Sequence, residues 1–61
     1  MAAKFEIYED KSGEFRWRLI HTNGQVIANS GEGYTTKANA MGGISSVKEN
    51  TPNAPVEDKT A

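Results

Sequence analysis

Glu14-Phe15-Arg16-Trp17-Arg18-Leu19 is the stretch of sequence that decides the fold, and it alternates charged and apolar residues with a period of two. Alternation of this kind is typical of a β-strand that turns one face to a core and the other to solvent. The apolar positions include the single tryptophan of the 61-residue chain. Residues 14–19 are therefore predicted to form a core strand with a neighbouring strand on each side.

A first hairpin is predicted immediately before this strand. Residues 4–9 alternate in the same way, and the segment 10–13, Asp-Lys-Ser-Gly, is rich in turn-forming residues. A three-residue loop ending in Gly13 is typical of a type I turn followed by a left-handed glycine. This loop places Asp10 opposite Glu14 and gives the cross-strand pairs Phe5–Leu19, Glu6–Arg18, Ile7–Trp17 and Tyr8–Arg16. A four-residue loop would mix polar and apolar faces and is rejected.

A second hairpin is predicted after the strand, which ends near His21-Thr22. Asn23-Gly24 is the strongest short hairpin signal in the chain and favours a two-residue turn. That turn places Leu19 opposite Ala28 and His21 opposite Val26, in a third strand over roughly residues 25–30. Both turns then predict one shared core face of a three-stranded antiparallel meander, made of Phe5, Ile7, Phe15, Trp17, Leu19, Val26 and Ala28.

An amphipathic helix is predicted beyond a break at residues 30–34, Ser-Gly-Glu-Gly-Tyr. Thr35 or Thr36 can cap its first turn, because a threonine hydroxyl accepts from an exposed backbone N–H. Apolar residues recur at helical spacing from Lys37 onward and stop before Pro52, namely Ala40, Ile44 and Val47, with Met41 beside them. Gly42-Gly43 lowers the stability of the predicted helix by about 1 kcal/mol per glycine relative to alanine. One of these glycines is explained if the helix approaches the sheet closely there.

The chain after the helix is ambiguous in its sequence. Pro52-Asn53-Ala54-Pro55 cannot continue a helix, and Val56-Glu57-Asp58 is short and polar. The pattern alone allows a frayed tail or a short edge strand, and it favours the tail.

One helix leaves the other face of the sheet uncovered, and that face is predicted to carry Lys4, Glu6, Tyr8, Arg16, Arg18, Ile20 and Ile27. Most of these residues form a cross-strand pattern of opposite charges, which contributes little to stability when exposed. The predicted Asn23-Gly24 turn places Ile20 directly opposite Ile27. An apolar pair next to Tyr8 is consistent with contact to a second subunit or a ligand, and equally with chance exposure of single apolar residues.

Length and composition indicate one small domain with a marginal core. A chain of 61 residues buries only about 60% of the surface that its unfolded form exposes. Domains of this size are commonly supported by disulfides, a metal ion or a partner subunit, although some fold unaided. The chain has no cysteine and a single histidine, His21, so oligomerisation is the support that remains.

Charge and hydropathy argue against several classes of partner. The net charge is −1 with both signs mixed along the chain, so no basic patch favours nucleic acid or an anionic membrane surface. No apolar run approaches the roughly 20 residues of a membrane span. Residues 1–4 lead directly into a strand pattern, so no signal peptide is visible. We expect a soluble cytoplasmic protein.

Candidate catalytic and ligand-binding motifs are weak. Gly31-Glu32-Gly33 lies where a phosphate loop would lie, but it lacks the Lys-Ser/Thr pair, and Glu32 would repel phosphate. His21 has no acid or base partner nearby in sequence, and no serine or threonine lies in a nucleophile motif. A base-stacking platform on Trp17 is disfavoured, because alternation puts Trp17 on the opposite face from Arg16 and Arg18. We expect no enzymatic activity, no cofactor and no metal.

The chain resembles the YegP-like family of small, uncharacterised bacterial proteins, which contain one or two copies of a unit about this long. The resemblance covers nearly the whole chain, from about Lys4 to Asp58. It rests on the combination of Phe5-x-Ile7-Tyr8, Gly13-Glu14-Phe15-Arg16-Trp17-Arg18-Leu19, Asn23-Gly24, Ser30-Gly31-Glu32-Gly33-Tyr34, Lys37 and Ile44-x-x-Val47-Lys48-x-Asn50.

What the resemblance implies is structural, because the family has no established biochemical activity. The unit is an α+β fold of the order β-β-β-α-β, and two units assemble one sheet and exchange their last strands. A chain with one copy should form a homodimer, with Val56-Glu57-Asp58 as the exchanged strand. One domain over residues 1–61 is expected, ordered over about 4–58, with 1–3 and 59–61 frayed. Gly42 departs from the family, where a longer side chain is commoner at this position, and a less stable helix is expected from it.

The favoured interpretation is a small, non-enzymatic homodimeric binding or interaction module, whose partners are a second copy and an unknown protein. The alternative is a nucleic-acid-associated accessory protein that uses the arginine-bearing face. No membrane partner is expected. The candidate interface or binding surface consists of Tyr8, Arg16, Arg18, Ile20, Ile27 and Val56.

Overall fold

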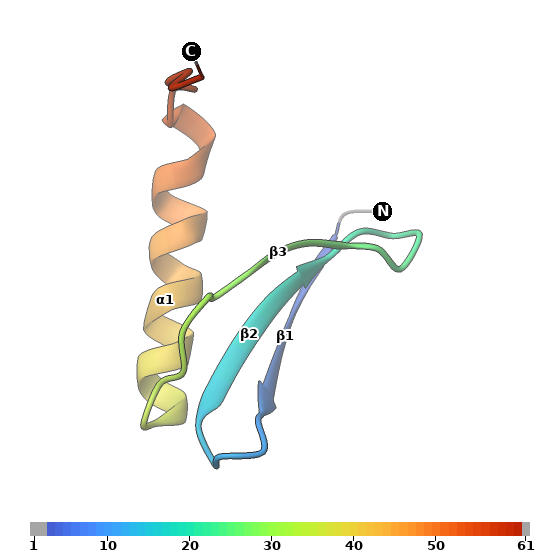
Figure 1. The fold of residues 1–61 in the computed structure, drawn as a ribbon, viewed down its shortest axis with the longest axis vertical. Helices are drawn as coiled ribbons and strands as arrows, with labels where there is room; N and C mark the ends of the chain where they lie inside the picture. Colours follow the sequence, from blue (N-terminus) through green and yellow to red (C-terminus); the bar gives the residue numbers. More distant parts are fainter. Residues whose placement is uncertain (1–2, 61) are drawn as a thin grey trace.

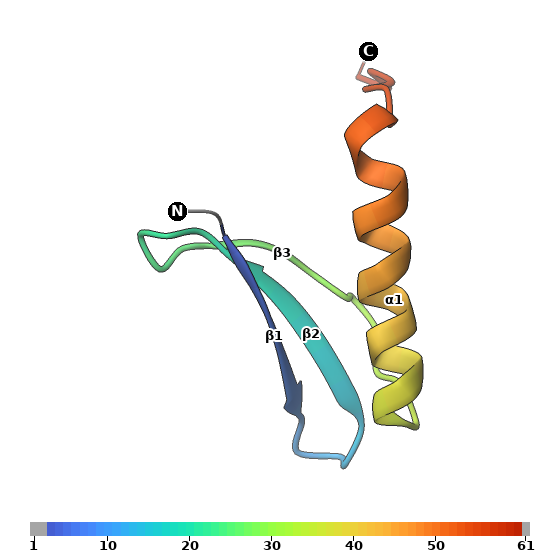
Figure 2. The same cartoon turned by 180° about the vertical axis from the view of Figure 1, so that it is seen from behind.

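A computed structural model describes residues 3–60 as an α+β fold in which one helix packs on one face of a three-stranded antiparallel sheet (Figures 1 and 2). The strands lie in the order β1-β2-β3, as the two predicted hairpins require. Fraying was predicted for residues 1–3 and 59–61, and of these residues 1, 2 and 61 lie outside the described part. The elements are β1 (Lys4–Glu9), β2 (Phe15–Ile20), β3 (Val26–Asn29), α1 (Lys37–Asn50) and a short 3-10 helix, η1 (Thr51–Asn53).

The first hairpin is confirmed in turn type and in register. Asp10 N–H donates to Glu14 O at 2.8 Å and Gly13 N–H donates to Asp10 O at 3.0 Å, which closes a three-residue loop. Gly13 has a φ of 86°, the left-handed conformation that glycine adopts without a steric penalty. The cross-strand pairs follow as predicted: Phe5–Leu19, Glu6–Arg18, Ile7–Trp17 and Tyr8–Arg16.

The second hairpin differs from the predicted two-residue turn. His21 N–H donates to Gln25 O at 2.8 Å and Gly24 N–H donates to His21 O at 2.8 Å, so the loop holds three residues. A two-residue type I′ turn needs a positive φ at both central residues, but only Gly24, with a φ of 93°, has one. Side chains support the longer loop, because His21 Nδ1 accepts from Asn23 N–H at 3.2 Å and Asn23 Oδ1 accepts from Gln25 N–H at 3.0 Å.

A β-bulge in β3 compensates for the extra loop residue. Ile20 pairs with Val26 and Leu19 pairs with Ala28, so Ile27 is one residue more than β2 can match. The bulge restores the predicted Leu19–Ala28 pair. The predicted pairs of Val26 with His21 and of Ile27 with Ile20 are wrong, because Val26 occupies the position opposite Ile20.

The core is small and centres on Trp17, as the alternation in residues 14–19 predicts. Trp17 is 6% exposed and packs with buried Ala40 and Ile44 of α1. The Phe5 ring meets the Trp17 ring edge-on, with centroids 5.6 Å apart and an interplanar angle of 75°, a favourable arrangement for aromatic pairs. Partly buried side chains surround this centre: Phe5, Ile7, Phe15, Tyr34 and Val47.

The predicted core face extends further across the sheet than the actual core does. Val26 and Ala28 were predicted to be inside, but both are exposed, and Leu19 is only half-buried. The reason is the position of α1, which packs on β2 and β1 and makes no contact with β3. Figures 1 and 2 show the helix close to the sheet at its N-terminal half and diverging from it toward residue 50.

The helix begins and ends where the sequence predicts. Thr36 is the N-cap, and its Oγ1 accepts from Asn39 N–H at 3.1 Å. At the other end Thr51 Oγ1 donates to Val47 O at 2.7 Å, and Pro52 lies in the following 3-10 turn. The close approach predicted for one glycine occurs at Gly43.

The segment between β3 and α1 adds a contact that the sequence did not predict. Phe15 and Tyr34 exchange two backbone hydrogen bonds of 2.8 and 2.7 Å, forming an isolated β-bridge at the edge of β2. Ser30 N–H donates to Trp17 O at 2.9 Å. Residues 30–34 therefore run along the same edge of β2. This path brings the Tyr34 ring under the helix beside Gly43.

The segment after η1 forms no strand within the single chain. Residues 54–60 are exposed throughout, and Val56 is 96% exposed. Ala54 has extended backbone angles, with φ −75° and ψ 123°. The predicted last strand of the β-β-β-α-β order is therefore absent from the isolated chain.

Candidate interaction surface

The face of β1 and β2 that points away from α1 carries a compact group of polar side chains, which we call the arginine face: Glu6, Tyr8, Asp10, Arg16 and Arg18. Period-two spacing places Glu6 and Tyr8 of β1, and Asp10 directly after it, on one side, and the confirmed register places both arginines beside them. Three of the six predicted interface residues, Tyr8, Arg16 and Arg18, thus lie together.

Arg18 contacts two neighbours on β1. Its Nε donates to Glu6 Oε1 at 3.0 Å, and its guanidinium carbon lies 4.7 Å from the centre of the Tyr8 ring. Lys4 Nζ lies 3.4 Å from the second oxygen of Glu6. The hydrogen bond from Arg18 lowers the pKa of Glu6, with a smaller contribution from Lys4. Arg18 thereby lies over the Tyr8 ring, whose negative face attracts the cation.

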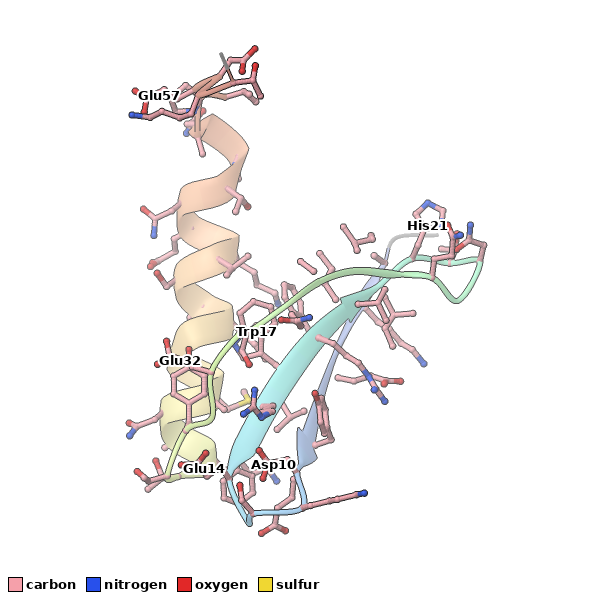
Figure 3. The ribbon with its side chains drawn as sticks, in the orientation of Figure 1. Asp10, Glu14, Trp17, His21, Glu32 and Glu57 are labelled. Atoms are coloured by element: carbon pink, nitrogen blue, oxygen red, sulfur yellow. The ribbon has the colours of Figure 1, made fainter. Side chains whose placement is uncertain are left out.

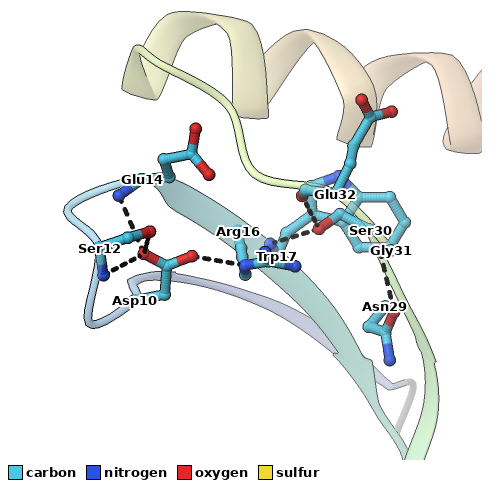
Figure 4. A network of polar contacts seen from close by, with 9 residues as sticks. All are labelled: Asp10, Ser12, Glu14, Arg16, Trp17, Asn29, Ser30, Gly31 and Glu32. Carbon is cyan, nitrogen blue, oxygen red and sulfur yellow. Dashed lines mark hydrogen bonds and ion pairs between the residues drawn. The ribbon is translucent and has the colours of Figure 1, made fainter.

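Asp10 organises the other end of the arginine face (Figure 4). Its Oδ1 accepts from Ser12 N–H at 2.9 Å, from Ser12 Oγ at 2.7 Å and from Glu14 N–H at 3.0 Å. Its Oδ2 accepts from Arg16 Nε at 2.6 Å. The pKa of Asp10 is strongly lowered, first by the Arg16 hydrogen bond and then by those from Ser12 and Glu14, and the pKa of Arg16 is raised.

This geometry predicts acid-sensitive stability. A carboxyl group whose pKa is lowered by folding stabilises the fold fully above its unfolded pKa of about 4, and the contribution is lost as the pH falls through the lower folded pKa. Asp10→Asn keeps an acceptor for Ser12 and Glu14 but removes the charge that Arg16 contacts. We expect it to lower the denaturant midpoint at neutral pH, and we expect the difference from the wild type to shrink steadily as the pH falls below about 4.

The matched control for this prediction is Glu57→Gln. Glu57 also forms an ion pair, with Lys59 at 3.2 Å, but both side chains are about four-fifths exposed and lie in the C-terminal tail. An exposed pair of this kind contributes little, so the midpoint should not change at either pH. Equal midpoints for the wild type and Asp10→Asn at neutral pH would contradict the role given to Asp10.

The other three predicted interface residues lie elsewhere. Ile20 is half-buried on β2 and faces Val26 across the strands, while Ile27 is 53% exposed at the bulge. Val56 lies in the tail beyond the helix. Figure 3 places its neighbour Glu57 at the far end of α1, well away from Asp10. A single chain therefore does not bring all six residues together.

The side chains considered for chemistry are occupied in structural roles. His21 caps the second turn at the tip of the hairpin (Figure 3). In the 30–34 segment Ser30 Oγ donates to Glu32 O at 2.8 Å, and the Glu14 side chain lies across Gly33, so a carboxylate covers that glycine. Among residues 3–60 no three histidine or acidic side chains gather as a metal-binding group. No described helix has the length and apolar character needed to cross a membrane.

The Asp10–Arg16 pair is the part of this surface that sequence reasoning missed. Arg16 was predicted to face Tyr8, and it does so in register, but its side chain reaches diagonally to Asp10. Arg18 makes the same diagonal contact with Tyr8. Diagonal neighbours on one face of a sheet are within reach of long side chains, so the predicted register already contained the signal.

Comparison with known proteins decides the family. The family described as "Domain of unknown function (DUF1508)" matches residues 10–58. The chain belongs to this family. It is 55% identical over 60 residues to UPF0339 protein Msl4696 of Mesorhizobium japonicum, covering 98% of this chain and 100% of that protein. It is 57% identical over 56 residues to a UPF0339 protein of Treponema denticola, covering 92% and 95%.

A solved structure from the same comparison has the same fold. The NMR solution structure of a protein from Haloferax volcanii has a TM-score of 0.88 and 49% sequence identity, covering 93% of this chain and 95% of that one. The resemblance to YegP-like proteins is thereby confirmed. The expectation of a purely bacterial family is wrong, because DUF1508 relatives also occur in archaea. The function of the DUF1508 family is unknown.

Proposed function

We propose that this DUF1508 chain is a non-enzymatic, cytoplasmic homodimeric binding module, in which the C-terminal segments of two copies are exchanged. The observation that carries the proposal is the surface that a single chain leaves uncovered. Its accessible surface is 4892 Å², whereas a folded monomer of 6.6 kDa exposes about 3,900 Å². The excess of about 1,000 Å² is close to the roughly 800 Å² that each partner buries in a standard interface.

The dimensions of the chain support the same proposal. Its radius of gyration is 13.1 Å, compared with about 10.5 Å for a compact domain of 61 residues. Among the described residues only Trp17, Ala40 and Ile44 are buried, and a core this small is a weak basis for independent stability. A second copy would cover exposed apolar residues on β3 and in the tail: Val26, Ile27 and Val56.

The C-terminal tail is the segment best suited to exchange. It is fully exposed, it begins in an extended conformation, and it contains one β-branched apolar residue, Val56, directly after Pro55. Pro55 disfavours a helical conformation at Ala54, the residue before it. A short extended segment with one large apolar side chain can add to the sheet of another copy by backbone pairing.

The arginine face is the surface that the assembled dimer would offer to a protein partner. Each arginine already contacts one carboxylate, Arg18 with Glu6 and Arg16 with Asp10, so the face presents alternating charges instead of a basic stripe. Nucleic-acid binding depends on unneutralised Lys and Arg side chains that displace counterions. The paired geometry therefore favours a protein partner of mixed charge over nucleic acid.

Analytical ultracentrifugation of the full chain and two tail variants tests the dimer. Val56→Asp should weaken dimerisation by about tenfold or more, because it places a charge where an apolar side chain is expected to be buried. Thr60→Asp, which adds the same charge beyond residues 56–58, is the matched control and should leave the dissociation constant unchanged. Equal dissociation constants for all three proteins would contradict the exchange.

A binding assay with labelled single- and double-stranded oligonucleotides separates the two functional classes. The proposed protein-binding module should show no binding even at low salt. Binding that weakens steeply as salt rises would indicate phosphate contacts and would replace this proposal with the nucleic-acid alternative.

A further inference from the structure

The arginine face has hydrogen-bond donors to spare, whereas its carboxylate oxygens already face donors. Glu6 Oε1 accepts from Arg18 Nε at 3.0 Å, and Glu6 Oε2 lies 3.4 Å from Lys4 Nζ. Both oxygens of Asp10 also accept hydrogen bonds. A guanidinium group has five N–H donors, and within the part of the chain that the structure describes Nε is the only donor that either arginine uses. The Nη groups of Arg16 and Arg18 are therefore left to a partner, which must supply acceptors.

Both guanidinium groups are held in place and remain accessible to solvent. Asp10 Oδ2 fixes Arg16 Nε at 2.6 Å (Figure 4), while Glu6 and the Tyr8 ring, 4.7 Å away, fix Arg18. The two arginine side chains are 34% and 42% exposed. A long side chain that is already ordered loses less conformational entropy when it binds. The two arginines thus form a pre-organised pair of cationic groups on the solvent side of the sheet.

The spacing of the two arginines matches the spacing of side chains in an extended segment. Arg16 and Arg18 are two residues apart on β2, so their side chains leave one face of the sheet about 7 Å apart. Both side chains lean in the same direction along the hairpin, to Asp10 and to Tyr8 respectively, and the separation is kept. Alternate side chains of another extended segment have the same separation. Two carboxylates at such positions can each meet one guanidinium group.

We propose that the arginine face binds an acidic segment of a protein partner, whose carboxylates at alternate positions of an extended backbone meet the Nη groups of Arg16 and Arg18. This inference rests on the binding module proposed above and specifies the chemistry of its protein partner. The planar guanidinium group matches a carboxylate geometrically, because it can form two parallel N–H···O bonds to it. The residues of the partner that meet the two arginines are therefore aspartate or glutamate.

The charges around the two arginines favour carboxylate side chains over a phosphate backbone. Lys4, Arg16 and Arg18 supply three positive charges, and Glu6 and Asp10 supply two negative ones. Nucleic acid draws its affinity from the neutralisation of several phosphates and the release of their counterions. A surface with one excess positive charge neutralises few phosphates, and its two carboxylates repel a continuous row of them. Two separate carboxylates need to contact only the arginines.

NMR titration of the full-length ¹⁵N-labelled protein with three capped, threonine-rich peptides tests the proposal. The first peptide carries two glutamates at alternate positions, the second carries them at adjacent positions, and the third carries two glutamines at alternate positions. Adjacent side chains of an extended peptide point to opposite faces, so only one of them can meet an arginine. We expect the first peptide to shift the Nε–H signals of Arg16 and Arg18. It should bind about threefold more tightly than the second peptide and about tenfold more tightly than the third.

Three single substitutions separate the guanidinium group from simple charge. Arg18→Gln and Lys37→Gln each remove one positive charge, but Lys37 lies at the start of α1 and not on the arginine face. Arg18→Gln should weaken binding of the first peptide by about threefold or more, whereas Lys37→Gln should change it by less than about twofold. Arg18→Lys keeps the charge and removes the planar group, and it should also bind this peptide more weakly than the wild type.

Failure of this inference is distinguishable from failure of the proposed homodimer. Equal binding of the three peptides, or unshifted Nε–H signals of Arg16 and Arg18 at millimolar peptide, would overturn the acidic-segment proposal and leave the dimer, which sedimentation measures, unaffected. Equal losses from Arg18→Gln and Lys37→Gln would overturn it as well. Oligonucleotides that shift the same Nε–H signals with a steep salt dependence would overturn both this inference and the protein-binding function.

Discussion

Trp17→Ala should lower the free energy of unfolding by about 3–5 kcal/mol, the usual range for a buried aromatic residue truncated to alanine. Trp17, at 6% exposure, is the largest buried side chain among residues 3–60, and the other two buried residues there, Ala40 and Ile44, pack against it. Phe5 also loses its edge-on partner in this variant. A domain this small has little stability in reserve, so the variant should be largely unfolded.

Circular dichroism during thermal and urea denaturation measures this effect. Met41→Ala is the control, because Met41 is an apolar residue of α1 that is 51% exposed. Truncation of an exposed side chain usually changes stability by no more than about 0.5 kcal/mol. A Trp17→Ala variant with a cooperative transition close to that of Met41→Ala would show that the core does not depend on Trp17.

Gly43→Val should have the second largest effect, because the helix touches the sheet at this residue. A β-carbon at Gly43 would lie 2.7 Å from the Tyr34 hydroxyl oxygen and 3.0 Å from Trp17 Nε1. These atoms belong to Trp17 in the core and to Tyr34, which packs against it, so the helix or the Tyr34 side chain would have to move away. Overpacking typically costs about 1–3 kcal/mol, and valine adds two more methyl groups to the contact.

The adjacent glycine provides the matched control with the opposite sign. A β-carbon at Gly42 would meet nothing within 4 Å, so Gly42→Ala should raise helix stability by about 1 kcal/mol. The pair separates helix propensity from steric contact, since both positions lie in the middle of α1. Equal effects of the same sign at the two positions would contradict the packing described for Gly43.

A double substitution refines the explanation for Gly43. Tyr34→Phe removes the oxygen that lies nearest to the added β-carbon, while the ring carbon that carried it remains 3.2 Å away. Gly43→Ala should therefore be less destabilising in the Tyr34→Phe background than in the wild type. Additive free energies from this cycle would show that the hydroxyl group is not the source of the clash.

The sequence predicts the fold well where local and non-local signals agree. The first hairpin is correct in every pair, because its turn chemistry and the alternation of both strands allow one register. In the second hairpin Asn23-Gly24 predicted a two-residue turn, whereas the loop has three residues and a positive φ at Gly24 but not at Asn23. His21-Thr22-Asn23-Gly24-Gln25 has its glycine in the same position as Asp10-Lys11-Ser12-Gly13-Glu14, and both form three-residue loops. Comparing the two turns would have predicted the correct loop.

Burial was harder to predict than register. Alternation places Val26 and Ala28 in a strand, but it cannot say how far across the sheet one helix of 14 residues reaches. The divergence of α1 from β3 depends on the close contact at Gly43 and on the path of residues 30–34. Neither feature has a periodic sequence signal.

The sequence predicted only part of the candidate surface, namely the part that the strand register fixes. Tyr8, Arg16 and Arg18 lie together because the strand register fixes their positions. The contact between Arg16 and Asp10 depends on side-chain reach, and the position opposite Ile20 depends on a bulge that the sequence pattern does not reveal. Val56 lies apart from the other five residues in the single chain, and it would join them only in the proposed dimer.

The most direct test of this account is an isotope-filtered NOE experiment on a dimer refolded from equal amounts of ¹³C-labelled and unlabelled chains. The account predicts intermolecular NOEs from the Val56 methyl groups of one copy to residues of the sheet of the other. A sample that sediments at the 6.6 kDa of one chain, or a dimer in which Val56 shows no intermolecular NOE, would contradict it.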